Sequence, residues 1–236
     1  MEEDLNSIYK ILLKAYGKQG WWPIADISSG KSEYGINAPG DEADIFEIVI
    51  GSILTQNVAW VNVEKALLSL KKKRLLDPLK LYKAKHDVIA RCIIPSGYYN
   101  QKTKKIKNFL SWFKGYGFSF EPLMSVKTES LRRELLGING IGPETADSIL
   151  LYGLRRKVFV VDAYTRRIFS RLGLISFNDS YESVRELFQK KTSGGFAKYN
   201  EYHALIVIHG KDVCKKKALC DSCCLGNICP SFKEFF

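Results

Sequence analysis

The sequence lacks any apolar run that approaches the roughly 20 residues needed to cross a membrane as a helix, so no membrane span is expected. Its first residues are acidic and then follow a helical pattern, which suits neither a secretory signal nor a transit peptide. Repeats of solenoid period and low-complexity tracts are also missing. We therefore expect a protein that stays inside the cell and does not associate with membranes.

Acidic residues are in short supply. The 236 residues include 25 Asp and Glu against 36 Lys and Arg, which leaves a formal net charge of +11. Such an excess attracts polyanions through a long-range field and through counterion release, so nucleic acid is the first partner to consider. A charge that only keeps the protein soluble is the alternative. With 46% hydrophobic residues, the chain can build the core of one large domain or of two small ones.

Cysteine is almost absent from most of the chain, but five of the six cysteines lie in the last 23 residues. In a reducing cell, such crowding favours ligation of a metal or a cluster over disulfides. Cys214, Cys220, Cys223 and Cys229 follow the pattern Cys-x5-Cys-x2-Cys-x5-Cys. Four thiolates on a short segment can hold a [4Fe–4S] cluster or a tetrahedral zinc ion, and the spacing alone does not decide between them. Cys224 is then a spare cysteine, although a pairing with Cys220 stays open.

Strand-like alternation is nearly absent, and helical periodicity runs along most of the chain. The one strand-like run, residues 157–161, is short and has no evident partner, so we expect an extended segment there. A loop is expected over residues 28–40, where glycine, serine and proline gather. The predicted helices cover residues 3–17, 45–54, 60–72, two short stretches within 76–93, then 101–113, 129–136, 143–152, 162–172, 181–189 and 198–210. The sequence predicts an all-α protein.

A glycine-rich turn between two of these helices is the most informative stretch. Gly137, Gly140 and Gly142 allow a tight hairpin with positive φ and no side chain between the backbone and a ligand. Pro143 then suits the first turn of a helix. Backbone N–H groups of the turn and of the new helix would form an anion site suited to a DNA phosphate. An ordinary helix–helix corner is the alternative, but the pattern Gly-Ile-x-Gly-Ile-Gly in so basic a chain favours phosphate binding.

Residues 135–146 resemble the helix–hairpin–helix motif of the endonuclease III superfamily of DNA glycosylases. Residues 46–66 and 96–102 also match that superfamily. The chain is most similar to the bacterial 3-methyladenine glycosylases of endonuclease III type, over about residues 20–213. The shared features are Trp-Trp-Pro, Leu-Thr-Gln-Asn, Ser-Gly-Tyr-Tyr-Asn-Gln-Lys, Val-Val-Asp-Ala-Tyr and His-Gly-Lys. The resemblance implies base excision repair, in which the enzyme flips a damaged base out of duplex DNA and cuts its bond to the sugar.

The resemblance also implies two helical lobes with a DNA-binding cleft between them. One lobe would span residues 40–155 and contain the helix–hairpin–helix over 135–153. The other would join residues 1–39 to residues 156–236 and include a cluster loop over 214–229. The superfamily's cluster loop reads Cys-x6-Cys-x2-Cys-x5-Cys, one residue longer in its first gap, and the 3-methyladenine member compared lacks these cysteines. We expect a [4Fe–4S] cluster in preference to zinc, with a structural role.

Asp162 is the candidate catalytic residue. It follows a β-branched run and is a good N-cap for the helix over 163–172. In the superfamily, an aspartate at this place after the hairpin is the catalytic carboxylate. Breaking an N-glycosidic bond builds positive charge on the sugar, and a carboxylate can stabilise that cation and orient or deprotonate the attacking water. Capping and catalysis are compatible because a cap fixes the side chain.

Glu144 bears on whether the DNA strand is also nicked. Superfamily members with lyase activity carry a lysine two residues past the last hairpin glycine, and its amine forms a Schiff base with the sugar. Glu144 occupies that position here and cannot form such an adduct. The resemblance therefore implies a monofunctional glycosylase without abasic-site lyase activity.

An extruded base needs flat apolar surfaces, which aromatic side chains supply. The resemblance implies that Trp22 and Phe46 sandwich the base, with Trp21, Glu144 and Lys211 at the same pocket. A cationic alkylated purine would gain further from cation–π attraction. Core packing is the alternative for each ring.

The remaining DNA contacts come from the same resemblance. Gln56 occupies the place of the side chain that fills the hole left by the flipped base, and Tyr98 that of the intercalating wedge. Gln56 satisfying backbone groups and Tyr98 as a plain surface aromatic are the alternatives. Contacts to the DNA backbone are expected from the hairpin, at Gly137, Gly140, Gly142 and Thr145.

The expected partner is double-stranded DNA that contains a damaged base, with an alkylated purine such as 3-methyladenine as the favoured lesion. Oxidised or deaminated pyrimidines or a mismatched thymine are alternatives on the same fold, with or without lyase activity. A DNA-damage-binding module without catalysis is a third. We expect a monomer in a prokaryotic cytoplasm, associated with the nucleoid.

Overall fold

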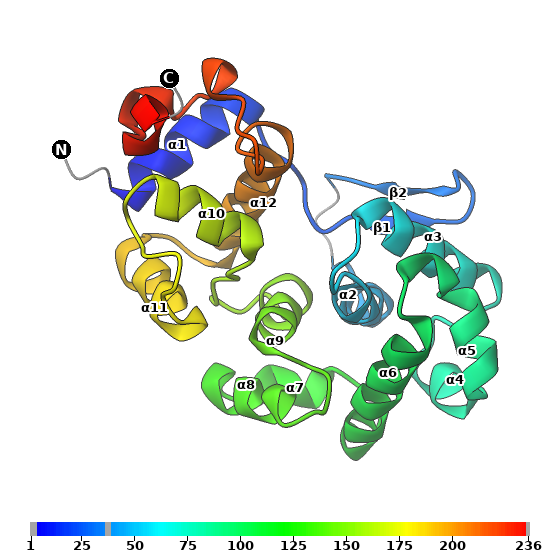
Figure 1. The fold of residues 1–236 in the computed structure, drawn as a ribbon. Coiled ribbons are helices and arrows are strands. Elements are labelled where there is room, and N and C mark those ends of the chain that lie inside the picture. Colours follow the sequence, from blue (N-terminus) through cyan, green and yellow to red (C-terminus); the bar gives the residue numbers. More distant parts are fainter. Residues whose placement is uncertain (1–3, 36–38, 235–236) are drawn as a thin grey trace. The chain divides into compact units, whose positions relative to one another are not determined.

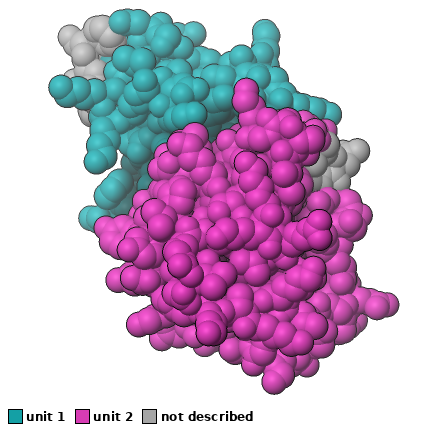
Figure 2. All heavy atoms as spheres, turned by 90° about the vertical axis from the view of Figure 1, so that its right-hand side faces the viewer, with its two compact units in different colours: residues 1–21, 157–236 teal, residues 22–156 magenta. Residues whose placement is uncertain are grey.

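The computed structural model describes residues 4–35 and 39–234, so residues 36–38 of the predicted loop over 28–40 lie outside the described residues. The chain divides into two compact units. Unit 1 joins Met1–Trp21 to Lys157–Phe236, and unit 2 is Trp22–Arg156. Figure 2 shows the atoms of the two units in different colours. The predicted lobe over 40–155 lies inside unit 2, but unit 2 also begins earlier, at Trp22, than the predicted boundary at residue 39.

Unit 2 is built around helix α2 (Glu42–Leu54), whose residues 45–54 are all buried. A helix that is apolar on all sides must be covered on all sides. Helix α3 (Trp60–Lys72), helix α6 (Tyr99–Phe113) and the π-helical turn η3 (Ile149–Gly153) all pack against α2. Asp41 begins α2, because its carboxylate accepts a hydrogen bond from the Asp44 N–H at 2.9 Å.

The other helices of unit 2 are short and connect these elements (Figure 1). They are α4 (Pro78–Lys83), α5 (His86–Cys92), η1 (Ile94–Ser96), η2 (Lys114–Tyr116), α7 (Glu121–Ser125), α8 (Thr128–Leu136) and α9 (Pro143–Ser148). Helices α8 and α9 flank the glycine-rich turn, and α9 continues directly into η3. The predicted helix over 143–152 is therefore an α-helical turn followed by a wider π-helical one.

A small β-hairpin is an addition to the predicted all-helical pattern. Strand β1 (Ile24–Asp26) pairs antiparallel with β2 (Lys31–Glu33), in the register Ile24 to Glu33. The buried Glu47 of α2 accepts a hydrogen bond from the Ala25 N–H at 2.6 Å and forms an ion pair with Lys71 of α3 at 2.5 Å. These contacts tie the hairpin to α2 and α3. The molecule is mostly helical, as predicted, but part of the expected loop is this hairpin.

Unit 1 contains α1 (Leu5–Tyr16), α10 (Ala163–Arg171), α11 (Tyr181–Lys191) and α12 (Phe196–Asp212). Helix α12 packs against both α1 and α10, so the two ends of the chain share one core (Figure 1). The Tyr202 hydroxyl donates to the Leu5 carbonyl at 2.8 Å across this contact. Residues 157–161 lie outside any helix or sheet, with a bend at residue 157, and residues 158–161 are buried.

The chain ends in three single 3₁₀ turns: η4 (Cys220–Ser222), η5 (Gly226–Ile228) and η6 (Pro230–Glu234). These turns follow α12; Cys220 begins η4, and Cys223, Cys224 and Cys229 lie in the short segments between the turns. In the part of the chain that the structure describes, no helix is both long enough and apolar enough to cross a membrane.

Candidate functional site

The hairpin between α8 and α9 depends on one glycine for its shape. Gly140 has a φ of +96°, a conformation that L side chains rarely adopt. A Cβ atom there would also collide with the side chain of Lys105 on α6. The prediction of positive φ is right for Gly140 but wrong for the other two glycines, because Gly137 (φ −71°) is right-handed helical and Gly142 (φ −90°) is extended.

Gly142 is the N-cap of α9, and Pro143 occupies the first helical position, as predicted. The first N–H groups of any helix have no acceptor within the helix. A Cβ atom at Gly142 would meet no protein atom within 4 Å, so the space in front of this position is open. A phosphate could therefore approach the hairpin backbone at Gly142 without meeting a protein side chain.

Gln56 and Thr145 meet at the hairpin, although 89 residues separate them. Gln56 Nε2 donates to the Thr145 hydroxyl at 2.9 Å and to the Gly140 carbonyl at 3.1 Å. Lys105 Nζ donates to Gln56 Oε1. In this conformation Gln56 satisfies a backbone carbonyl, which is the alternative stated above. To enter a DNA duplex, its side chain would exchange these bonds for bonds to a base.

A buried ion pair joins the two hairpin helices. Arg132 of α8 donates from Nε to Asp147 Oδ1 at 2.6 Å and from Nη2 to Oδ2 at 3.0 Å. The side chains are 7% and 0% exposed. A bidentate pair of this kind fixes the angle between its elements as well as their distance. The geometry of the hairpin therefore depends on this pair as well as on its glycines.

Tyr98 stands out from the surface of unit 2. Its side chain is 71% exposed, and its backbone is left-handed, with a φ of 44°. The preceding Gly97 also has a positive φ. The ammonium group of Lys102 lies beneath this turn and donates to the Ser96 carbonyl at 2.6 Å and to the Leu54 carbonyl at 2.8 Å. Burial, with a smaller effect of Lys105, lowers the pKa of Lys102 to about 8. The turn that presents Tyr98 is thus fastened to the end of α2.

The aromatic residues predicted to hold a base lie in the interior. Trp22 is 4% exposed and Phe46 is fully buried. The Trp22 ring contacts Trp60 and Tyr152, each at 5.3 Å between ring centroids, and it lies against Gly51, where a Cβ would come within 2.8 Å of the indole. Core packing therefore describes both rings in this conformation, and their role in base binding stays a prediction.

The other predicted pocket residues are more accessible. Glu144 is exposed on the first turn of α9, in unit 2. Trp21 and Lys211 belong to unit 1, where Trp21 is half-buried and Lys211 is exposed near the end of α12. Their assignment to a base pocket also stays a prediction.

Asp162 caps α10, as predicted. Its Oδ1 accepts from the Thr165 N–H at 2.7 Å and from the Thr165 hydroxyl at 2.8 Å. Its Oδ2 lies 3.6 Å from Nε2 of His203 on α12. The residue is 9% exposed, and the buried residues 158–161 lead into it. Oδ1 is thus held by two hydrogen bonds, whereas Oδ2 faces the His203 imidazole beyond hydrogen-bond distance.

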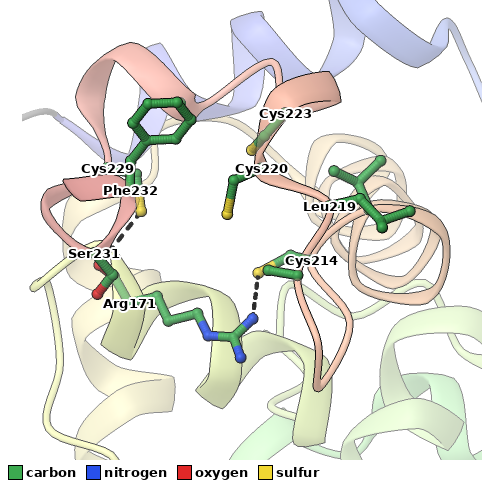
Figure 3. Close-up of a pocket in the computed structure, with 11 residues that line it drawn as sticks. Arg171, Cys214, Leu219, Cys220, Cys223, Cys229, Ser231 and Phe232 are labelled. Atoms are coloured by element: carbon green, nitrogen blue, oxygen red, sulfur yellow. Dashed lines mark hydrogen bonds between the residues drawn. The ribbon is translucent and has the colours of Figure 1, made fainter. Parts of the chain in front are cut away.

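The four cysteines predicted as ligands line one cavity, together with Arg171 of α10 (Figure 3). The space not filled by atoms is about 320 Å³, part of it open solvent. Cys224 is not among the lining residues. Within the described ranges, no group of three or more His, Cys, Asp or Glu side chains is arranged to hold a metal ion. Four thiols around a shared space fit the donor set of a [4Fe–4S] cluster, which binds four cysteine thiolates.

Arg171 and burial act on different cysteines of this group. Arg171 Nη1 donates to Cys214 Sγ at 3.2 Å and to the Lys215 carbonyl at 2.7 Å, which brings a positive charge next to the first cysteine. Burial raises the pKa of the Cys223 thiol to about 11 and also raises the pKa of Cys229. Such thiols lose their protons when they bind a positively charged metal centre.

Several residues of these sites carried no signal in the sequence. Lys105, the Arg132–Asp147 pair and His203 act through contacts between elements that are far apart along the chain. For His203 the sequence offers only the rarity of histidine, since the whole chain contains three.

Comparison with known proteins agrees with this fold. Residues 50–193 match the family described as HhH-GPD superfamily base excision DNA repair protein, and the chain belongs to this superfamily. It is a DNA glycosylase of base excision repair. The chain is 46% identical over 231 residues, 97% of each sequence, to MJ1434 of Methanocaldococcus jannaschii, which carries the name of a DNA repair glycosylase. It is 29% identical over 200 residues to endonuclease III of Sulfolobus acidocaldarius, covering 83% of this chain and 86% of that one.

Two solved structures resemble the protein along most of its length. The 3-methyladenine DNA glycosylase of H. pylori, bound to 1,N6-ethenoadenine, is 27% identical, with a TM-score of 0.67 and coverage of 89% of this chain and 98% of that one. An endonuclease III in a non-covalent complex with DNA has a TM-score of 0.76 at 19% identity, covering 99% and 97%. At 19% identity, the similarity to this endonuclease III shows a shared fold alone.

Proposed function

We propose that the protein is a monofunctional glycosylase that removes alkylated purines, such as 3-methyladenine, from duplex DNA. The observation that carries this proposal is the fixed carboxylate of Asp162, held at Oδ1 by two hydrogen bonds from Thr165. The likeness to a 3-methyladenine glycosylase at 27% identity supports the substrate class. The exposed Glu144, in place of the lyase lysine, supports a reaction that stops at base release.

Asp162 would act on the sugar. As the bond between base and deoxyribose breaks, the sugar becomes cationic, and a fixed negative charge stabilises that state more than it stabilises the intact nucleotide. The same carboxylate can accept a proton from the attacking water. Because Thr165 already orients Oδ1, the carboxylate needs little rearrangement at the moment of reaction.

Unit 2 would supply most of the contacts that bind DNA. The open backbone at Gly142 suits a phosphate, and the fastened turn at Tyr98 presents an exposed ring that can wedge between base pairs. Gln56 would then fill the space of the extruded nucleotide. For Trp22 and Phe46 to sandwich the base, their present packing must open, since both are buried.

Cys214, Cys220, Cys223 and Cys229 would hold a [4Fe–4S] cluster. When bound, the cluster supplies covalent links between four points of a segment with little regular structure, and so it orders residues 214–229. Arg171 would donate to the Cys214 sulfur and balance part of the cluster's negative charge. We assign the cluster no part in breaking the glycosidic bond.

A lesion panel tests the proposed reaction. Purified protein is incubated with methylated duplex DNA and with duplexes that contain uracil, an oxidised pyrimidine or a thymine–guanine mismatch. We expect release of free 3-methyladenine and a strand that stays intact until alkali treatment. Cleavage before alkali, or a complex trapped by borohydride, would contradict the monofunctional assignment. Release from pyrimidine substrates alone would contradict the substrate class, and binding without release would indicate a damage-binding module.

A further inference from the structure

His203 faces the proposed catalytic carboxylate from a different helix. It lies in α12, 41 positions after Asp162, and its Nε2 is 3.6 Å from Asp162 Oδ2. Its side chain is 9% exposed, and that of Asp162 is 11% exposed. The Phe159 ring lies edge-on to the imidazole, at 6.5 Å between centroids. An imidazole beside a carboxylate in so enclosed a place interacts with it far more strongly than it would in water.

The charged and titratable groups on the neighbouring elements are engaged elsewhere. On α10, Arg166 donates to the Asp179 carbonyl, and Arg167 donates to the Gly210 and Cys214 carbonyls. On α12 itself, the Tyr199 hydroxyl donates to the Thr192 carbonyl at 3.2 Å, and that of Tyr202 donates to α1. In the segment that precedes Asp162, Lys157 lies over the Tyr199 ring. Among the described residues, Asp162 is the charged side chain whose effect on His203 the structure gives.

We propose that His203 is a positioning residue for base excision, which steadies Oδ2 of Asp162 while Thr165 holds Oδ1. This inference rests on the proposed function, since it gives His203 a role only if Asp162 acts on the sugar. A carboxylate oxygen has more than one lone-pair direction, so contact with His203 leaves Oδ2 able to face the sugar or the water. At 3.6 Å the His203 contact is electrostatic and not a hydrogen bond, and it adds to the two bonds from Thr165 that orient the carboxylate.

The charge state of His203 then sets how strongly the Asp162 carboxylate can stabilise a cationic sugar. Burial lowers the pKa of His203 below its usual value of 6.5, and the charge of Asp162 opposes this only in part. At neutral pH the imidazole is uncharged, and Asp162 keeps its full effect on a cationic sugar. When the pH falls through the lowered pKa, the imidazolium pairs with Asp162 and cancels part of its charge. The excision rate should fall with it.

Two substitutions separate positioning from plain packing. His203→Gln keeps an N–H donor but removes the titration, whereas His203→Phe keeps a ring of similar volume and removes both. We expect His203→Phe to lower the single-turnover rate of base release at pH 7.5, by up to about 10²-fold, the loss that a misplaced catalytic group can cause. We expect His203→Gln to keep more of that rate and to shift the acid limb of the pH–rate profile to lower pH.

The experiment uses the purified holoprotein and whichever DNA lesion the panel identifies, from pH 4.5 to pH 8, with the spontaneous loss of the base subtracted. His86→Gln is the matched control, because His86 is an exposed histidine of unit 2 and its loss should leave the profile unchanged. Tyr202→Phe controls for disturbance of the α12 core. Circular dichroism reports whether each variant folds.

The outcomes distinguish this inference from the proposed function. If Asp162→Asn keeps the wild-type rate, the proposed function fails and the inference fails with it. If Asp162→Asn is inactive while His203→Gln keeps the wild-type acid limb, the proposed function stands and the role of His203 is refuted. Should His203→Phe fail to fold, the pH profile of His203→Gln decides alone.

Discussion

Asp147→Asn should lower the stability of unit 2 strongly, because it removes one charge from the Arg132–Asp147 ion pair, which is buried away from water. Arg132 and Asp147 are 7% and 0% exposed, and two hydrogen bonds join them. Breaking a buried pair while one partner remains costs about 3–5 kcal/mol, since the remaining charge is left without compensation. For a chain of this length, each kcal/mol moves the unfolding midpoint by about 2–4 °C, so the expected loss is about 6–20 °C.

A matched substitution tests the reasoning behind that magnitude. Asp87→Asn also removes an aspartate that pairs with an arginine, but both side chains of the Asp87–Arg91 pair are 66% exposed. Exposed pairs contribute about 0–1 kcal/mol, so its midpoint should move by only a few degrees. Thermal unfolding of the holoprotein, followed by far-UV circular dichroism, measures both variants. Equal shifts in the two variants would refute the argument from burial.

The remaining predictions concern the DNA grip and the cysteines. Gly140→Ala should distort the hairpin, because a side chain at positive φ costs about 1–2 kcal/mol of strain. We expect this to weaken binding to duplex DNA by about tenfold in a fluorescence anisotropy titration. Gly115→Ala, where an added Cβ meets open space, should leave the affinity unchanged. Cys214→Ser should abolish the iron content of the purified protein, whereas Cys224→Ser should retain it, and equal iron in both would refute the assigned ligands. Tyr98→Ala should slow base release without lowering thermal stability, because the ring is exposed.

Local sequence signals predicted most of the helices. Helix α3 has the predicted bounds of 60–72, because its apolar positions repeat with helical spacing. The start of α2 was predicted three residues late, since the capping role of Asp41 precedes the apolar run. The β-hairpin was missed because each strand has only three residues, too few for a pattern of alternation.

The functional residues also differ in whether a short stretch of sequence or the packing of distant helices determines them. The cap at Asp162 and the four cysteines around one cavity follow from short stretches of chain, so the sequence could indicate them. His203 and the Arg132–Asp147 pair depend on how separate helices pack, and no spacing along the chain reveals that. The burial of Trp22 is a further case, since an aromatic residue reads the same in a sequence whether it binds a ligand or fills a core.

The decisive measurement of the catalytic role of Asp162 is the release of 3-methyladenine from methylated DNA by wild type and by Asp162→Asn under single-turnover conditions. Asparagine can still accept the two bonds from Thr165, so the cap is kept while the negative charge is lost. We expect wild type to free the base and the variant to do so at least about 10²-fold more slowly. A variant that folds, binds DNA and releases the base at the wild-type rate would contradict it.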